Sequence, residues 1–101
     1  MNNKINAFIK KIIKVYNPVK IYVFGSAAKS QQDEYSDVDI AVIAGSDLGF
    51  IKRLRKSVDL LPKLSGVDLL IYTPDEFNEM VSKNNQFAQE ILKGKVVYEK
   101  S

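Results

Sequence analysis

Short apolar runs bounded by turn residues constrain the fold of this chain more than any other feature. Residues 19–24, VKIYVF, are mostly β-branched or aromatic and stop at Gly25-Ser26. The apolar pattern resumes at 37–44, after a polar loop, and again at 67–72, VDLLIY. Runs of this length and composition are typical of β-strands. The sequence therefore predicts a sheet that contains at least three strands.

Helical segments separate these runs. Apolar residues recur at helical spacing in 3–16 and again within 47–64. The motif TPDE at 73–76 predicts a helix start, because threonine caps, proline fits the first helical position and the glutamate can complete a capping box. Helical character continues to Gly94, with a break near the two asparagines, and 95–98 is expected to be a short edge strand. The predicted fold is α/β, a small mixed sheet flanked by helices.

Composition narrows the class of protein and the chemistry. A chain of 101 residues, 46% hydrophobic and 27% charged, is expected to form a single soluble domain spanning 1–101. It has no cysteine and no histidine, which excludes thiolate metal sites and histidine bases. The lack of cysteine agrees with a reducing cytoplasm. No apolar stretch approaches the ~20 residues of a membrane span. We therefore expect a cytoplasmic protein without a membrane partner.

Basic residues gather in two helical segments. They are Lys4, Lys10, Lys11 and Lys14 in the first, and Lys52, Arg53, Arg55 and Lys56 in the second. Such groups usually form solvated helix faces. Nucleic-acid binding is an alternative, but the groups lack interleaved aromatic residues or a known motif. Nucleic acid is therefore not expected as a partner.

Carboxylates open two of the predicted strands. Side chains alternate along a strand, so Asp37 and Asp39 point to one face, with Cα atoms about 6.6 Å apart. Asp68 repeats the feature in the third strand, and the three converge if these strands are neighbours. Like charges so placed repel and raise one another's pKa unless a cation joins them. Mg²⁺ suits such oxygen ligands, together with waters and substrate phosphates.

Each carboxylate also has a structural interpretation. Asp37 can be a turn residue, since Ser-Asp is common in loops. Asp39 can pair with a lysine, and Asp68 can form a salt bridge with Lys20 or Lys95. These alternatives remain open from the residues alone.

Gly25-Ser26 suggests a phosphate-binding turn. Glycine lets the backbone approach a ligand closely. Backbone N–H groups at the start of a following helix, with the Ser26 hydroxyl, would hold phosphate oxygens. Lys29 would add a positive charge. The alternative is a simple packing turn between a strand and a helix.

Taken together, these features resemble the nucleotidyltransferases of the DNA polymerase β superfamily. The order is strand, Gly-Ser, ten residues, Asp-x-Asp opening a second strand, and one Asp inside a third. More specifically, the chain looks like a minimal nucleotidyltransferase (MNT) domain, the small partner in HEPN/MNT toxin–antitoxin pairs. Members often carry an arginine directly after the Gly-Ser pair and a glycine four positions after the serine. This chain has Ala27 and Ser30 there.

The resemblance implies a site and a reaction. Asp37, Asp39 and Asp68 would bind two Mg²⁺ ions, and Gly25 and Ser26 would grip the nucleotide triphosphate. The donor would be ATP, and AMP would pass to a hydroxyl of a HEPN-domain toxin, a tyrosine, so silencing a ribonuclease. A chain this short leaves little room for an acceptor-binding domain, which also favours an acceptor on a partner protein. The alternative is a non-catalytic antitoxin that neutralises its partner by forming a complex.

Overall fold

The computed structural model describes residues 3–25, 38–62, 64 and 66–100. Its elements are α1 (Asn3–Tyr16), β1 (Lys20–Phe24), β2 (Val38–Ile43), α3 (Phe50–Leu60), β3 (Val67–Tyr72), α4 (Pro74–Ser82), α5 (Gln86–Leu92) and β4 (Lys95–Glu99). No helix among these residues is long and apolar enough to cross a lipid bilayer.

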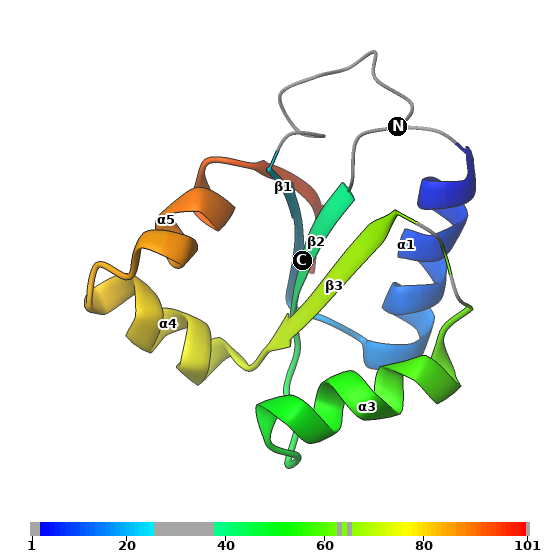
Figure 1. Ribbon diagram of the computed structural model, residues 1–101, viewed down its shortest axis with the longest axis horizontal. Coiled ribbons are helices and arrows are strands. Elements are labelled where there is room, and N and C mark those ends of the chain that lie inside the picture. The colour runs from blue at the N-terminus through cyan, green and yellow to red at the C-terminus, as the bar shows by residue number, and fades with distance from the viewer. Residues whose placement is uncertain (1–2, 26–37, 63, 65, 101) are drawn as a thin grey trace.

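The four strands form one mixed sheet in the order β3-β2-β1-β4. β2 and β3 run parallel, and β1 runs antiparallel to both β2 and β4. α3 belongs to the connection between the two parallel strands, which need a crossover rather than a hairpin. The predicted small mixed sheet flanked by helices is confirmed (Figure 1).

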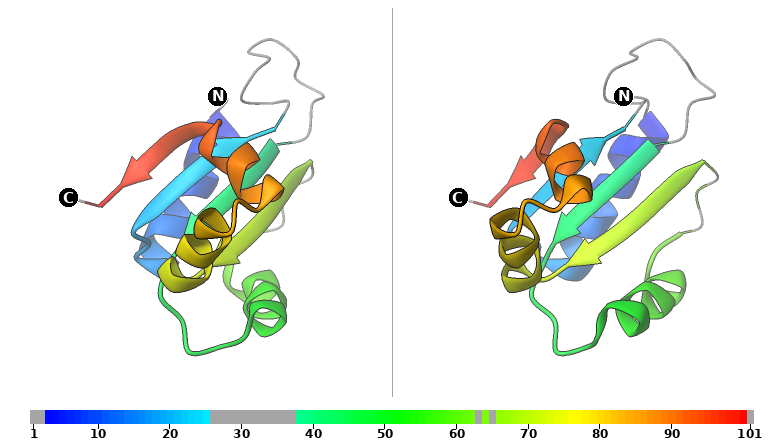
Figure 2. Two further views of the ribbon diagram at one scale, coloured as in Figure 1. Left: turned by 90° about the vertical axis from the view of Figure 1, so that its left-hand side faces the viewer. Right: turned by 60° about the vertical axis from the view of Figure 1, so that its left-hand side comes forward.

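Helices cover both faces of the sheet. α1 packs on one face, and α4 and α5 pack on the other (Figure 2). Alternation along the strands divides the core accordingly. Ile21 and Ile40 pack with Ile12 of α1, and Ala41 packs with Ile91 of α5. All of these side chains are fully buried, so the sheet has an apolar core layer on each of its two faces.

Local chemistry explains where the helices begin and end. Asn17 takes a left-handed conformation, φ 47°, directly before Pro18 and ends α1. α3 is shorter than the helix expected over 47–64. Its C-cap, Leu61, is extended because the residue before a proline avoids the helical region.

The capping box predicted at 73–76 is confirmed. The Glu76 N–H donates to Thr73 Oγ1 at 3.1 Å, and the Thr73 N–H donates to Glu76 Oε1 at 2.9 Å. Proline occupies the first turn, where its missing N–H has no intrahelical partner to lose. This start fixes the direction in which the chain leaves β3.

Arg53 corrects one sequence expectation. It was expected on a solvated basic face, but its side chain is only 3% exposed. The guanidinium donates to the carbonyl oxygens of Leu48 (2.8 Å) and Ile71 (2.7 Å) and to both carboxylate oxygens of Glu76. Arg53 therefore joins α3 to the end of β3 and the start of α4. The distant partner that makes burial tolerable cannot be seen in the α3 sequence alone.

Candidate functional site

The parallel pairing of β2 and β3 places Asp39 directly beside Asp68. Paired residues on adjacent strands point to the same face, with backbones about 4.8 Å apart. Both aspartates lie in the second position of their strands, at the end of the sheet where β1 finishes (Figure 1). The expectation that these two strands are neighbours is confirmed.

Both carboxylates belong to the face of the sheet that α4 and α5 cover. Asp39 lies two residues before the buried Ala41, which packs with the apolar cluster under those helices. Phe24 of β1 is the antiparallel partner of Asp39 and belongs to the same cluster. The two carboxylates therefore lie on the same face of the sheet as this apolar cluster, at the end where β2 and β3 begin.

Gly25 approaches the Asp39 side chain so closely that no other residue fits. Its φ is +78°, a conformation that side chains disfavour. A Cβ at this position would overlap Asp39 Oδ2 and lie 3.3 Å from Asp39 Cγ. The glycine thus holds the end of β1 against a site carboxylate. Its role in phosphate binding remains a prediction.

Three predicted site residues lie outside the described part of the chain. They are Ser26, Lys29 and Asp37. Their predicted roles, two in nucleotide binding and one in metal binding, remain predictions.

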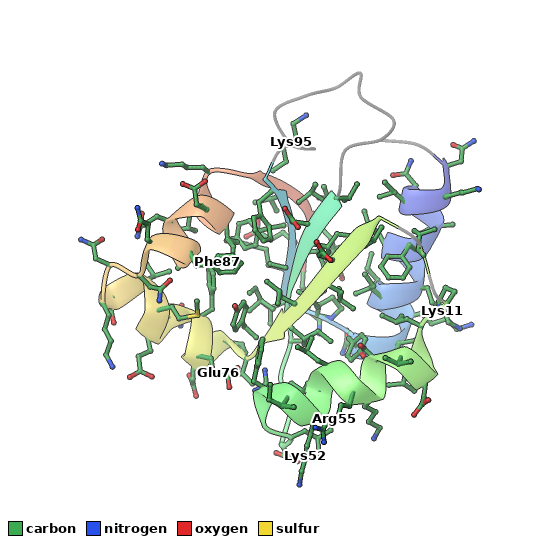
Figure 3. The ribbon with its side chains drawn as sticks, viewed as in Figure 1. Lys11, Lys52, Arg55, Glu76, Phe87 and Lys95 are labelled. Atoms are coloured by element: carbon green, nitrogen blue, oxygen red, sulfur yellow. The ribbon has the colours of Figure 1, made fainter. Side chains whose placement is uncertain are left out.

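The lysines considered as partners of Asp68 do not pair with it. Lys20 lies at the opposite end of β1 and forms an ion pair with Glu99 at 3.4 Å. Lys95 starts β4, at the same end of the sheet as the carboxylates (Figure 3). Among the residues that the structure describes, Asp68 has no ion pair.

This donor set suits a hard cation. The described residues contain no group of three potential metal ligands, but they include two adjacent carboxylates, Asp39 and Asp68. Adjacent like charges favour a bound cation, and oxygen ligands favour Mg²⁺ over a softer metal. The predicted third ligand, Asp37, precedes β2 by one residue. The residues present therefore fit Mg²⁺.

A cavity of about 160 Å³ lies elsewhere, at the other end of the sheet. Its lining includes Tyr16 at the end of α1, Ser46 after β2, and Lys56 and Leu60 of α3. Because Asp39 and Asp68 start their strands and this lining follows β2, the cavity is separate from the carboxylates.

Sequence reasoning missed one residue beside the site. Phe87 of α5 makes an edge-to-face contact with Phe24, with ring centroids 5.5 Å apart. In the sequence it is one apolar residue of the last predicted helical segment, and that pattern does not place it beside the carboxylates. Only the pairing of Phe24 with Asp39 reveals that this ring lies near the carboxylates.

Comparison with known proteins agrees with this geometry. The family described as "Polymerase beta, Nucleotidyltransferase" matches residues 7–101. The "Probable protein adenylyltransferase MntA" of Haemophilus influenzae is 32% identical over 82 residues, covering 76% of this chain and 72% of the relative.

Solved structures share the fold. A crystal structure described as "a putative nucleotidyltransferase from Sulfolobus solfataricus" superposes with a TM-score of 0.65 at 14% identity, covering 95% of this chain and 78% of that one. A crystal structure of a toxin–antitoxin with AMP-PNP superposes with a TM-score of 0.59 at 27% identity, covering 99% and 76%. With its two carboxylates on neighbouring strands and Gly25 packed against one of them, Asp39, this chain belongs to the polymerase beta nucleotidyltransferase family.

Proposed function

We propose that this protein is the antitoxin of a toxin–antitoxin pair and acts as a Mg²⁺-dependent protein adenylyltransferase. In this proposal it transfers AMP from ATP to a tyrosine hydroxyl of a HEPN-type ribonuclease toxin and so silences the toxin. The observation that carries the proposal is the register of β2 and β3, which sets Asp39 beside Asp68 with Gly25 against the first.

Two relatives support the finer parts of the proposal. The relative from Haemophilus influenzae is named as a probable protein adenylyltransferase. The structure that is 27% identical is a toxin–antitoxin with AMP-PNP, an analogue of ATP. Carried over to this chain, these names favour ATP as the donor and a toxin as the acceptor. The HEPN class of the toxin and the tyrosine target rest on the family resemblance.

The chemistry assigns a role to each carboxylate. Asp37, Asp39 and Asp68 would hold Mg²⁺, which when bound stabilises negative charge on the attacking and leaving oxygens of an in-line displacement. Asp68 would take the proton of the acceptor hydroxyl. A bond forms between that oxygen and the α-phosphorus, the bond from the α-phosphorus to the bridging oxygen breaks, and pyrophosphate leaves. Docking of the toxin supplies the orientation on which much of the rate depends.

Mass spectrometry of the toxin after incubation with this protein, ATP and Mg²⁺ tests the proposal. We expect adducts of AMP mass on a toxin tyrosine. Asp39→Asn and Asp68→Asn should abolish the adducts. Asp59→Asn is the matched control, because Asp59 is an exposed carboxylate on α3, away from the site. It should leave the reaction unchanged.

The non-catalytic alternative predicts a different result. If the toxin stays unmodified and Asp68→Asn inhibits it as well as the unaltered protein does, neutralisation works by complex formation alone.

A further inference from the structure

A half-exposed aromatic ring lies beside the carboxylate end of the sheet. Phe87 is 43% exposed and projects from α5 toward the sheet (Figure 3). Its ring meets that of Phe24 edge to face, at 5.5 Å between centroids and an interplanar angle of 87°. Phe24 is the cross-strand partner of Asp39. Phe87 therefore contacts the residue that pairs with Asp39, and it lies on the same face of the sheet as the carboxylates.

The structure holds this ring firmly. Phe24, which supports it, is buried, and the turn at Gly94 presses against the Phe24 backbone so closely that a Cβ on the glycine would overlap it. α5 itself is anchored by Ala88 and Ile91, both fully buried. A ring fixed in advance loses little conformational freedom when a ligand packs on it.

Exposure alone would carry no conclusion, because single exposed apolar residues are common. Leu92 on the same helix is exposed to the same degree, 42%, and has no aromatic ring. What sets Phe87 apart is a flat ring, fixed against a buried ring, at the end of the sheet where the carboxylates lie. A flat, partly solvated apolar face next to a site for phosphate chemistry suits a nucleobase.

We propose that Phe87 stacks on the nucleobase of the donor nucleotide. This inference rests on the proposed nucleotidyltransferase function and adds a base-binding surface to it. Aromatic side chains bind unpaired bases through their π-faces, and this contact tolerates different bases. Phe87 would thus position the nucleoside half of ATP, while the carboxylate end of the sheet receives its phosphates.

Calorimetric titration of the full chain, in Mg²⁺, with ATP and with inorganic triphosphate tests this assignment. Triphosphate has the phosphates of ATP without the base. Phe87→Leu keeps an apolar contact with Phe24 but removes the flat face, whereas Phe87→Tyr keeps the ring. Leu92→Ala is the matched control on the same helix.

We expect Phe87→Leu to weaken ATP binding about fivefold or more, the lower end of the range for losing one stacked base. Binding of triphosphate should not change. Phe87→Tyr and Leu92→Ala should bind ATP like the unaltered protein. Equal ATP affinity in Phe87→Leu, or an equal loss for ATP and triphosphate, overturns the stacking role. If the unaltered protein binds neither compound, the proposed function fails and this inference falls with it.

Discussion

Removing the charge of Glu76 should destabilise the protein markedly. Its partner Arg53 is 3% exposed, whereas the Glu76 side chain is 40% exposed. Breaking a fully buried ion pair by removing one partner costs about 3–5 kcal/mol. Because water reaches the Glu76 side of this pair, the cost of removing the Glu76 charge should be smaller. It should approach the contribution of a hydrogen bond to a charged group, about 1.5–3 kcal/mol. We therefore expect Glu76→Gln to lower the free energy of unfolding by about 2 kcal/mol.

Glutamine isolates the charge, because it can still accept the capping hydrogen bond from the Thr73 N–H. Urea titration followed by circular dichroism at pH 7 measures the loss. Glu79→Gln is the matched control. Glu79 pairs with Lys83 across one helical turn, and both side chains are more than 60% exposed. That substitution should leave stability unchanged.

The loss should also depend on pH. The hydrogen bond from Arg53 lowers the pKa of Glu76 below its ordinary value, burial opposes this shift, and the bond from the Thr73 N–H adds to it. A carboxyl group whose pKa is lower in the folded state stabilises fully above its unfolded pKa, about 4.3, and loses this contribution as the pH falls through the folded pKa. The gap between the two proteins should be constant from pH 7 to about pH 5 and shrink in more acidic solution.

Two outcomes would refute this reasoning. A gap below about 0.5 kcal/mol at pH 7 would mean that the pair behaves like an ordinary surface salt bridge. A gap of full size at about pH 2 would mean that lost packing, rather than lost charge, is responsible.

Three further predictions concern the site and the core. Gly25→Ala should lower the free energy of unfolding by about 1–2 kcal/mol or more, which is the cost of placing a residue with a Cβ in the left-handed conformation. It should also abolish thermal stabilisation by Mg²⁺ and ATP, because the new Cβ overlaps the Asp39 side chain. Gly45→Ala, which meets no atom within 4 Å, should do neither in the same melting experiment. Asp68→Asn should leave the melting temperature without ligand within about 2 °C of that of the unaltered protein. It should remove the stabilisation by Mg²⁺ and ATP, which for the unaltered protein is about 2.7 kcal/mol at a ligand concentration of a hundred times Kd. Stabilisation that persists in this variant contradicts the role of Asp68 as a metal ligand. Tyr16→Phe should leave stability unchanged or raise it by up to about 1 kcal/mol in urea titration, because the Tyr16 hydroxyl is buried without a hydrogen-bond partner in the described structure; a loss of that size would reveal a partner.

Local patterns in the sequence predicted the elements well. The capping box at Thr73 and Glu76 and the strand at 67–72 depend on neighbours within a few residues, so spacing and residue type suffice. The common face of Asp39 and Asp68 depends on more than local spacing, because the two strands must be neighbours in register. The structure pairs these strands in parallel and sets the two aspartates side by side.

Contacts between distant segments could not be predicted in this way. The partner of Arg53 lies 23 residues away, on a different helix, and the α3 sequence resembles a solvated basic face. Phe87 shows the same limit. Helical periodicity cannot distinguish a core ring from one at the rim of a site, because the difference depends on which strand lies underneath.

The edge position of β4 links the site to the local stability of the fold. None of its five residues is fully buried, and its pairing with β1 is irregular between Ile21 and Tyr22. Strands of this kind open at lower free energy than central ones, so the amides of β4 should exchange with solvent deuterium before those of β2. When β4 opens, Gly94 leaves the backbone of Phe24, which supports Phe87. A ligand that needs this support should therefore slow amide exchange in a strand that it does not touch.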